Sequence, residues 1–217
     1  MPKITSVESQ KKNPKRFNIF LDGEFAFGAD EDLVVDRRLI LGKLLDTSDV
    51  EQLISDAEIG KLMERMYRLF NIRQRSEKEI KDYLKNLSFK RKLKGEEELP
   101  LNIINMAIEL MKKKGMVNDK QFAISWVHSR SRKYGPQRIK QELYKKGIDK
   151  EIIETVISGQ VTGYSEEVAQ KLLEKRLERW KSLPTLEFKK KAYDYLLRRG
   201  FNYEMVKNIV EKYIEKR

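Results

Sequence analysis

The chain has 217 residues and no cysteine, which excludes disulfide bonds, thiol nucleophiles and thiolate zinc sites. No apolar run approaches the roughly 20 residues that cross a bilayer, and no apolar signal-peptide segment is visible, so we expect a cytoplasmic protein without a membrane partner. The net charge is +12, yet residues 1–72 carry 11 Lys or Arg against 13 Asp or Glu. The basic excess lies in the remainder, which favours a polyanionic partner such as nucleic acid or, alternatively, a solubilising lysine-rich surface.

The N-terminal region carries a strand pattern. Apolar side chains alternate along Arg16–Phe27, and the dipeptide Asp22-Gly23 separates two alternating runs, which predicts a β-hairpin with a two-residue turn. The segment Ile4–Gln10 is a candidate third strand. Helical patterns begin near Ala29. We therefore assign residues 1–45 to a β-hairpin or meander with a short helix, and residues 46–72 to a connecting helix.

A helical pattern then recurs three times. Its first helix carries two apolar residues four positions apart, its second carries an apolar stripe, and a third helix follows the first two copies. The paired positions are Ile80 and Leu84, Ile139 and Leu143, and Ala192 and Leu196. We predict a mainly α fold in which tandem three-helix repeats form an elongated curved array. The repeats are placed at 73–132, at 133–182 and, truncated, at 183–217.

Several residues in these repeats have the chemistry of helix ends. Ser76 and Glu79 form a capping-box pattern, and Gly147 and Gly200 suit the left-handed position after a helix. Gly135-Pro136 is typical of a helix start. These residues are therefore interpreted as structural.

Two segments between helices read as loops. The segment Ser88–Pro100 is basic, then acidic, and ends in proline, and the segment Ser158–Tyr164 is a second linker. The basic residues Lys90, Arg91, Lys92 and Lys94 of the first segment, beside Phe89, either bind phosphates or belong to a solvated loop whose charges balance.

No grouping of residues suggests catalysis. His128 is the single histidine and is interpreted as structural, and no glycine-rich phosphate loop or dinucleotide fingerprint is present. We therefore expect no catalytic residue, no cofactor and no metal. Aromatic residues lie among the basic ones and suit base stacking, but their helical spacing favours packing. A binding protein is the favoured class.

Three motifs resemble the RecX family, whose members regulate the RecA recombinase. They are "RQRSEKEIKDYL" (Arg73–Leu84), "GMVNDKQFAISWVHSR" (Gly115–Arg130) and "KYGPQRIKQELYKKGI" (Lys133–Ile148). The resemblance implies three three-helix repeats behind a variable N-terminal region. It also implies a non-enzymatic protein that binds RecA and lies in the groove of the RecA–DNA filament. The charged segment Ser88–Pro100 departs from the family pattern.

What the resemblance implies for function is inhibition of RecA, through limits on filament extension, ATPase and strand exchange in recombination, DNA repair and the SOS response. The expected partners are RecA, its nucleoprotein filament and single- or double-stranded DNA, and we expect a monomer. The alternative is a helical-repeat DNA-binding protein that acts through phosphate contacts without RecA. The candidate contacts are the basic motif and loop residues Arg73, Arg75, Lys90, Arg91, Lys92, Arg130, Arg132, Lys133, Arg138, Lys145 and Lys146.

Overall fold

The computed structural model describes residues 1–160 and 165–215, and within these ranges the chain forms three strands and ten helices. It divides into two compact units. The N-terminal unit comprises Met1–Gln74 and Lys81–Val117, and the C-terminal unit comprises Arg75–Ile80 and Asn118–Arg217. The expectation of a mainly helical chain behind a small N-terminal sheet is confirmed.

The sheet is an antiparallel meander of β1 (Ile4–Gln10), β2 (Asn13–Leu21) and β3 (Glu24–Asp30), in that order. The expected hairpin turn joins β2 to β3. Asp22 and Gly23 both have positive φ, at 48° and 90°, as the favoured two-residue hairpin turn requires. The predicted strand at Ile4–Gln10 is present and pairs with β2.

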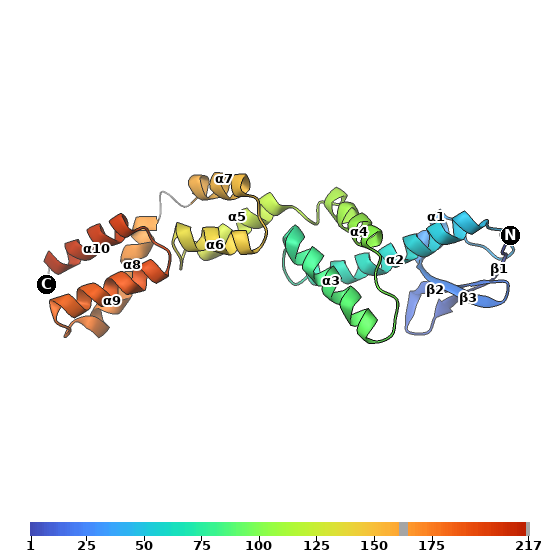
Figure 1. The fold of residues 1–217 in the computed structure, drawn as a ribbon, viewed down its shortest axis with the longest axis horizontal. Helices are drawn as coiled ribbons and strands as arrows, with labels where there is room; N and C mark the ends of the chain where they lie inside the picture. The colour runs from blue at the N-terminus through green and yellow to red at the C-terminus, as the bar shows by residue number, and fades with distance from the viewer. Residues whose placement is uncertain (161–164, 216–217) are drawn as a thin grey trace. The chain divides into compact units, whose positions relative to one another are not determined.

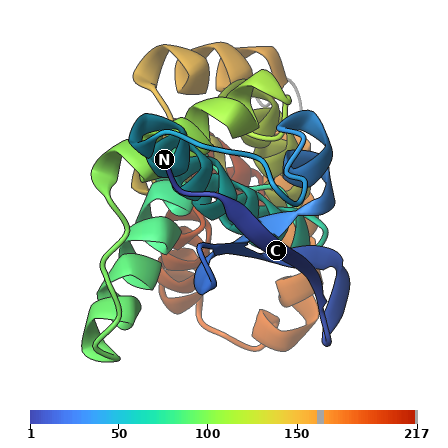
Figure 2. The ribbon, with the colours of Figure 1, turned by 90° about the vertical axis from the view of Figure 1, so that its right-hand side faces the viewer.

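One face of this sheet is covered by α1 (Glu31–Asp36) and the first half of α2 (Thr47–Phe70) (Figures 1 and 2). A side chain at Gly60 would place its Cβ 2.5 Å from Asp30 Oδ2, so glycine leaves room for the carboxylate that caps α1. The core between these elements contains Ile4, Ile19, Phe27, Ala29, Leu39, Leu45, Leu53 and Ala57.

Helix α3 (Glu77–Leu93) and helix α4 (Leu101–Lys113) complete the set that begins with α2. The prediction of a loop from Ser88 to Pro100 is wrong for its first half, because α3 continues to Leu93. The basic residues of its last turn complement the helix dipole, and the buried Ser88 hydroxyl accepts a hydrogen bond from Leu99 N at 3.0 Å. Only residues 94–100 form the connection.

Two three-helix groups follow, each around its own core (Figure 1). The first contains α5 (Asp119–Arg130), α6 (Pro136–Lys145) and α7 (Lys150–Gln160). The second contains α8 (Ser165–Trp180), α9 (Thr185–Arg198) and α10 (Tyr203–Glu215). The first core contains Phe122, Ala123, Val127, Ile139, Leu143, Ile148, Ile153, Val156 and Ile157, and the second contains Ala169, Leu173, Phe188, Ala192, Leu196, Phe201, Val206, Ile209 and Val210.

This grouping differs from the division at residue 133 that the sequence pattern suggests. Helix α5 buries Phe122 and Val127 with the helices that follow it, and α8 likewise packs with α9 and α10. The predicted linker at Ser158–Tyr164 is wrong at its start, because Ser158 to Gln160 belong to α7. Its remaining residues, 161–164, lie outside the described residues.

Within the C-terminal unit, two helix starts each dock against a glycine turn further along the chain, and we call these two contacts joints. In the first joint, Ser76 Oγ donates to Lys146 O at 2.7 Å, beside Gly147. Ser76 and Glu79 also form the predicted capping box, with hydrogen bonds of 3.2 and 3.4 Å. Gly147 has φ +76°, and its Cβ would lie 2.6 Å from Lys78 Cβ.

In the second joint, the start of α6 lies against the turn between α9 and α10. Gly135 N donates to Arg199 O at 2.8 Å, and Gln137 N donates to Gly200 O at 3.1 Å. A Cβ on Gly135 would lie 2.4 Å from Gly200 O, and Gly200 has φ +85°. Both glycines are therefore required for backbone to meet backbone.

We predict that Gly135→Ala lowers the free energy of unfolding of the C-terminal unit by about 1–3 kcal/mol, because the added methyl group forces the joint apart. Urea unfolding followed by tryptophan fluorescence measures this effect selectively, since both tryptophans of the chain, Trp126 and Trp180, lie in this unit.

The control is Gly159→Ala, because a Cβ at this helical position meets nothing within 4 Å. It should leave the free energy of unfolding unchanged or raise it by up to about 1 kcal/mol, because alanine has the higher helix propensity. The urea midpoint should therefore stay the same or rise. Equal midpoints for both variants would show that the close approach at Gly135 does not contribute to stability.

Candidate nucleic-acid interface

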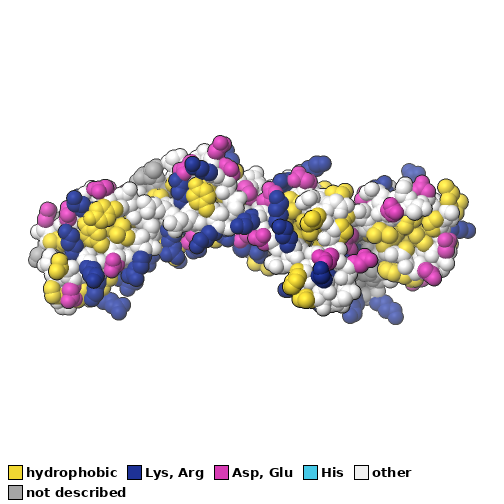
Figure 3. Space-filling view, viewed as in Figure 1, with side chains coloured by type: hydrophobic (Ala, Val, Ile, Leu, Met, Phe, Trp, Pro, Cys, Tyr) yellow, Lys and Arg dark blue, Asp and Glu magenta, His cyan; other side chains and the backbone are white. Residues whose placement is uncertain are grey.

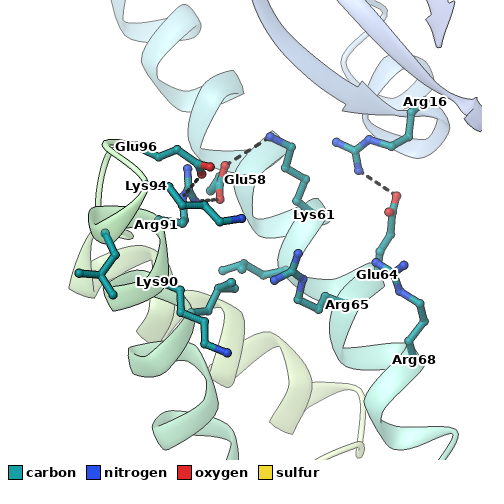
Figure 4. Close-up of a pocket in the computed structure, with 13 residues that line it drawn as sticks. Arg16, Glu58, Lys61, Glu64, Arg65, Arg68, Lys90, Arg91, Lys94 and Glu96 are labelled. Atoms are coloured by element: carbon teal, nitrogen blue, oxygen red, sulfur yellow. Dashed lines mark hydrogen bonds and ion pairs between the residues drawn. The ribbon is translucent and has the colours of Figure 1, made fainter. Parts of the chain in front are cut away.

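A surface cavity of about 660 Å³ lies between α2 and α3 in the N-terminal unit (Figure 4). Its lining contains seven cationic and three acidic side chains. This excess follows from two helices that each present basic residues to the space between them. The cations are Arg16, Lys61, Arg65, Arg68, Lys90, Arg91 and Lys94, and the acids are Glu58, Glu64 and Glu96.

The acids of this cavity are already engaged. Arg16 Nη1 lies 2.9 Å from Glu64 Oε1, and Glu58 forms ion pairs with both Arg91 and Lys61. In the described ranges, the remaining cations make no ion pair. Those cations are Arg65, Arg68, Lys90 and Lys94.

Unpaired cations on two facing helices suit a phosphate group, which accepts several charge-assisted hydrogen bonds. Figure 4 shows Arg65 of α2 and Lys94, at the end of α3, extending into the space between the two helices. Arg65 and Arg68 were not expected from the sequence. Their spacing from Lys61 places all three on one helical face, but no local pattern shows that this face meets α3.

The basic run that precedes the connection 94–100 separates into three different environments. Lys90 lines the cavity, whereas Arg91 is half-buried and pairs with Glu58. Lys92 is exposed and lies 2.6 Å from Glu98, whose hydrogen bond and negative charge raise the pKa of Lys92. Lys90 is therefore the member of this run that is available to a ligand in the cavity.

In the C-terminal unit, cations stack on two aromatic rings. The Arg130 guanidinium lies 4.9 Å from the centre of Trp126 and 5.3 Å from that of Tyr134. Lys146 Nζ lies 4.3 Å from the centre of Trp126, and the Arg138 guanidinium lies 4.3 Å from that of Tyr134. Such contacts orient the cations and stabilise the half-buried aromatic rings.

Glu142 joins this cluster. Its carboxylate accepts hydrogen bonds from Trp126 Nε1 and Arg130 Nε, both at 3.0 Å, and from Arg138 Nε at 3.4 Å. Glu142 is only 18% exposed, so it neutralises charge where water is largely excluded. Arg130, Arg138 and Lys146 thus have intramolecular roles in the packing of α5 and α6.

The other candidate residues of the C-terminal unit are less engaged. Arg132, Lys133 and Lys145 are exposed, and their side chains form no ion pair in the part of the chain that is described. Arg75 is half-buried, and its Nε has no hydrogen-bond partner among the described residues. Outside this unit, Arg73 Nη1 donates to Gln74 O at 2.9 Å.

The basic side chains are spread among acidic ones. Figure 3 shows Lys and Arg interspersed with Asp and Glu on the face in view. Among the described residues, no three His, Asp or Glu side chains are grouped as a metal site requires. Likewise, no helix described here has the length and apolar character needed to span a membrane.

We predict that Glu142→Ala lowers the free energy of unfolding of the C-terminal unit by about 1–3 kcal/mol, because three donors lose a largely buried acceptor. Tryptophan fluorescence during urea unfolding measures the change. Glu154→Ala is the matched control, since Glu154 forms a half-exposed pair with Lys140. That pair contributes about 0–1 kcal/mol, so comparable losses in both variants would contradict a special role for Glu142.

Comparison with known proteins relates the chain to one family. Residues 2–46 match the description "Regulatory protein RecX N-terminal domain". Residues 118–157 match "RecX, second three-helix domain", and residues 164–210 match "RecX, third three-helix domain". The last two ranges coincide closely with the groups α5–α7 and α8–α10, each of which has its own core.

Full-length relatives agree with these matches. The chain is 35% identical to the regulatory protein RecX of Bacillus subtilis over 208 residues, which cover 95% of this chain and 75% of that protein. It is 33% identical to the RecX of Bacillus velezensis over 214 residues, with 98% and 78% covered. A crystal structure of regulatory protein RecX shares the fold, with a TM-score of 0.71 and 24% identity over 97% of this chain and all of that one. The chain therefore belongs to the RecX family of regulatory proteins.

Proposed function

We propose that this protein regulates the RecA recombinase. It binds RecA and the groove of the RecA–DNA filament in the cytoplasm, limits filament extension and thereby lowers ATPase and strand exchange in recombination, DNA repair and the SOS response. The observation that carries this proposal is the match over nearly the whole chain to proteins named regulatory protein RecX. The protein acts as a monomer and by binding, not by catalysis.

The unpaired cations supply the contacts in this proposal. The cavity between α2 and α3 offers Arg65, Arg68, Lys90 and Lys94, and the C-terminal unit offers the exposed residues Arg132, Lys133 and Lys145. Cations of this kind bind the phosphates of the filament's DNA or acidic surfaces of RecA. Arg130, Arg138 and Lys146 position the aromatic cluster and contribute charge beside these residues.

A second candidate function is DNA binding without RecA. The unpaired cations of the α2–α3 cavity favour it, because they need only a phosphate backbone as ligand. The two functions differ in stoichiometry. A filament regulator acts at filament ends or on growth and works at low ratios to RecA, whereas a DNA competitor must cover the strand.

We predict that this protein inhibits ATP hydrolysis by RecA on single-stranded DNA at concentrations well below that of RecA. The ATPase rate is measured while the protein is titrated and naked DNA is kept in large excess. The excess removes inhibition that arises from competition for the strand.

Inhibition that appears only when the protein saturates the DNA would contradict the regulator proposal and support the second candidate function. A complex with RecA in the absence of DNA that persists at moderate salt would support the regulator proposal, because a pure DNA binder makes no such complex.

We also predict that the double variant Arg65→Gln and Lys90→Gln weakens duplex DNA binding and reduces its salt dependence. Each lost phosphate contact should lower the magnitude of the slope of log K against log salt by about 0.9 on duplex. The measurement is a fluorescence anisotropy titration at several salt concentrations.

The matched control is Lys85→Gln, which removes one charge from an exposed position on α3 that does not line the cavity. Its slope should equal that of the unaltered protein. If the double variant also kept that slope, the cavity would not be a phosphate contact.

A further inference from the structure

The two joints of the C-terminal unit occupy equivalent positions in the sequence repeat. The repeat that aligns Ile80 with Ile139 also aligns Glu79 with Arg138. The repeat that aligns Ile139 with Ala192 also aligns Lys146 with Arg199. In each joint the start of a helix thus meets a glycine turn, with Ser76 at the first contact and Gly135 at the second, and with different charged side chains beside it.

The first joint is balanced in charge. Glu79 Oε1 lies 2.7 Å from Lys146 Nζ, and both side chains are 19% exposed. Glu79 comes from the start of α3 and Lys146 from the turn before Gly147, so this ion pair bridges the two segments that meet. An acid and a base hold the first joint together.

The second joint has a cation on both sides. Arg138 replaces the glutamate and Arg199 replaces the lysine, and their guanidinium groups lie 4.3 and 5.8 Å from the centre of Tyr134. Arg138 Nε lies 3.4 Å from Glu142, whose carboxylate is shared with Arg130. Two positive charges beside one ring repel each other, and water screens part of this repulsion because 43% of the Arg138 side chain is exposed.

Beside these arginines lies a polar groove of about 300 Å³ between α6 and the end of α9. Lys145 and Arg198 line it together with Arg138, and Gln137 and Gln141 add neutral hydrogen-bond donors. The Lys145 side chain forms no ion pair in residues 1–160 and 165–215, and Arg198 Nε donates to a backbone carbonyl, Asp194 O. The groove therefore holds three cations and one carboxylate, Glu142, which is already shared.

We propose that this groove binds a phosphate group, which supplies at the second joint the negative charge that Glu79 supplies at the first. The bound phosphate contacts Arg138, Lys145 and Arg198 and holds the start of α6 to the turn that follows α9. That its source is the phosphodiester backbone of DNA rests on the proposed function. The phosphate chemistry of the groove does not depend on RecA.

The test is phosphate-dependent stability of the full chain. Urea unfolding, followed by the fluorescence of Trp126 and Trp180, is compared in sodium phosphate and in sodium chloride at equal ionic strength and pH. Phosphate should raise the unfolding midpoint, because a ligand that binds the folded state stabilises it. The double variant Lys145→Gln and Arg198→Gln, which alters two exposed side chains, should lose this shift.

The control is the double variant Lys120→Gln and Lys150→Gln, which removes the same charge from exposed positions of the same unit outside the groove. It should keep the full shift. Equal loss in both double variants would mean that phosphate acts on net charge alone and would overturn the proposal.

The position of the phosphate site is tested by the amide NMR spectrum of the full chain during titration with inorganic phosphate. The amides of Gln137, Arg138 and Gly200 should shift, and a response confined to other residues would overturn the site.

The source of the phosphate is tested in the same way. A single-stranded oligonucleotide that shifts the same amides at lower concentration than phosphate or ATP identifies nucleic acid as the source. If ATP shifted these amides at a lower concentration than the oligonucleotide, the groove would be assigned to a free nucleotide and the nucleic-acid source would be overturned. If phosphate shifted these amides but the protein did not inhibit the RecA ATPase, the proposed function would be rejected and the phosphate site would stand.

Discussion

The close approach of backbone to backbone at Gly135 and Gly200 is the constraint on which the C-terminal unit depends. The groups α5–α7 and α8–α10 each bury their own apolar core, so the contact between them must come from elsewhere. It comes from main-chain hydrogen bonds that form only where no Cβ intervenes. Neighbour-to-neighbour contact of this kind is the rule in repeat proteins, where stability is nearly the sum of repeat and interface contributions.

Because the backbone sets this geometry, the side chains around it are free to differ. At the first joint they form an ion pair, and at the second Arg138 lies over the ring of Tyr134 while Arg199 lies between the rings of Tyr134 and Tyr195, at 5.8 and 4.6 Å. Glu142 limits the resulting repulsion by accepting hydrogen bonds from Arg130, Arg138 and Trp126. Aromatic faces and a single shared carboxylate thus allow many positive charges to gather without unfolding the helices that carry them.

Features that depend on neighbouring residues were predictable from the sequence. The turn at Asp22-Gly23, the capping box of Ser76 and Glu79 and the positive φ of Gly147 and Gly200 each follow from local backbone chemistry. The division into three-helix groups was not predictable, because the apolar stripe of α5 does not say which neighbour covers it. The charged sequence around Lys90 is typical of a loop, but basic residues also stabilise the C-terminal turn of a helix, which is where Lys90 lies. The cavity cations Arg65 and Arg68 were invisible because α2 and α3 meet through tertiary packing.

The order of joints along the C-terminal unit has a consequence for its fluctuations. The group α5–α7 is held on both sides, by the hydrogen bond from the Ser76 hydroxyl at the start of α3 to Lys146 O and by the main-chain hydrogen bonds that join Gly135 and Gln137 to the turn after α9. The group α8–α10 meets the rest of this unit at one such joint in the described residues. Local opening should therefore start from α8–α10, and its amide hydrogens should exchange with solvent before those of α5–α7.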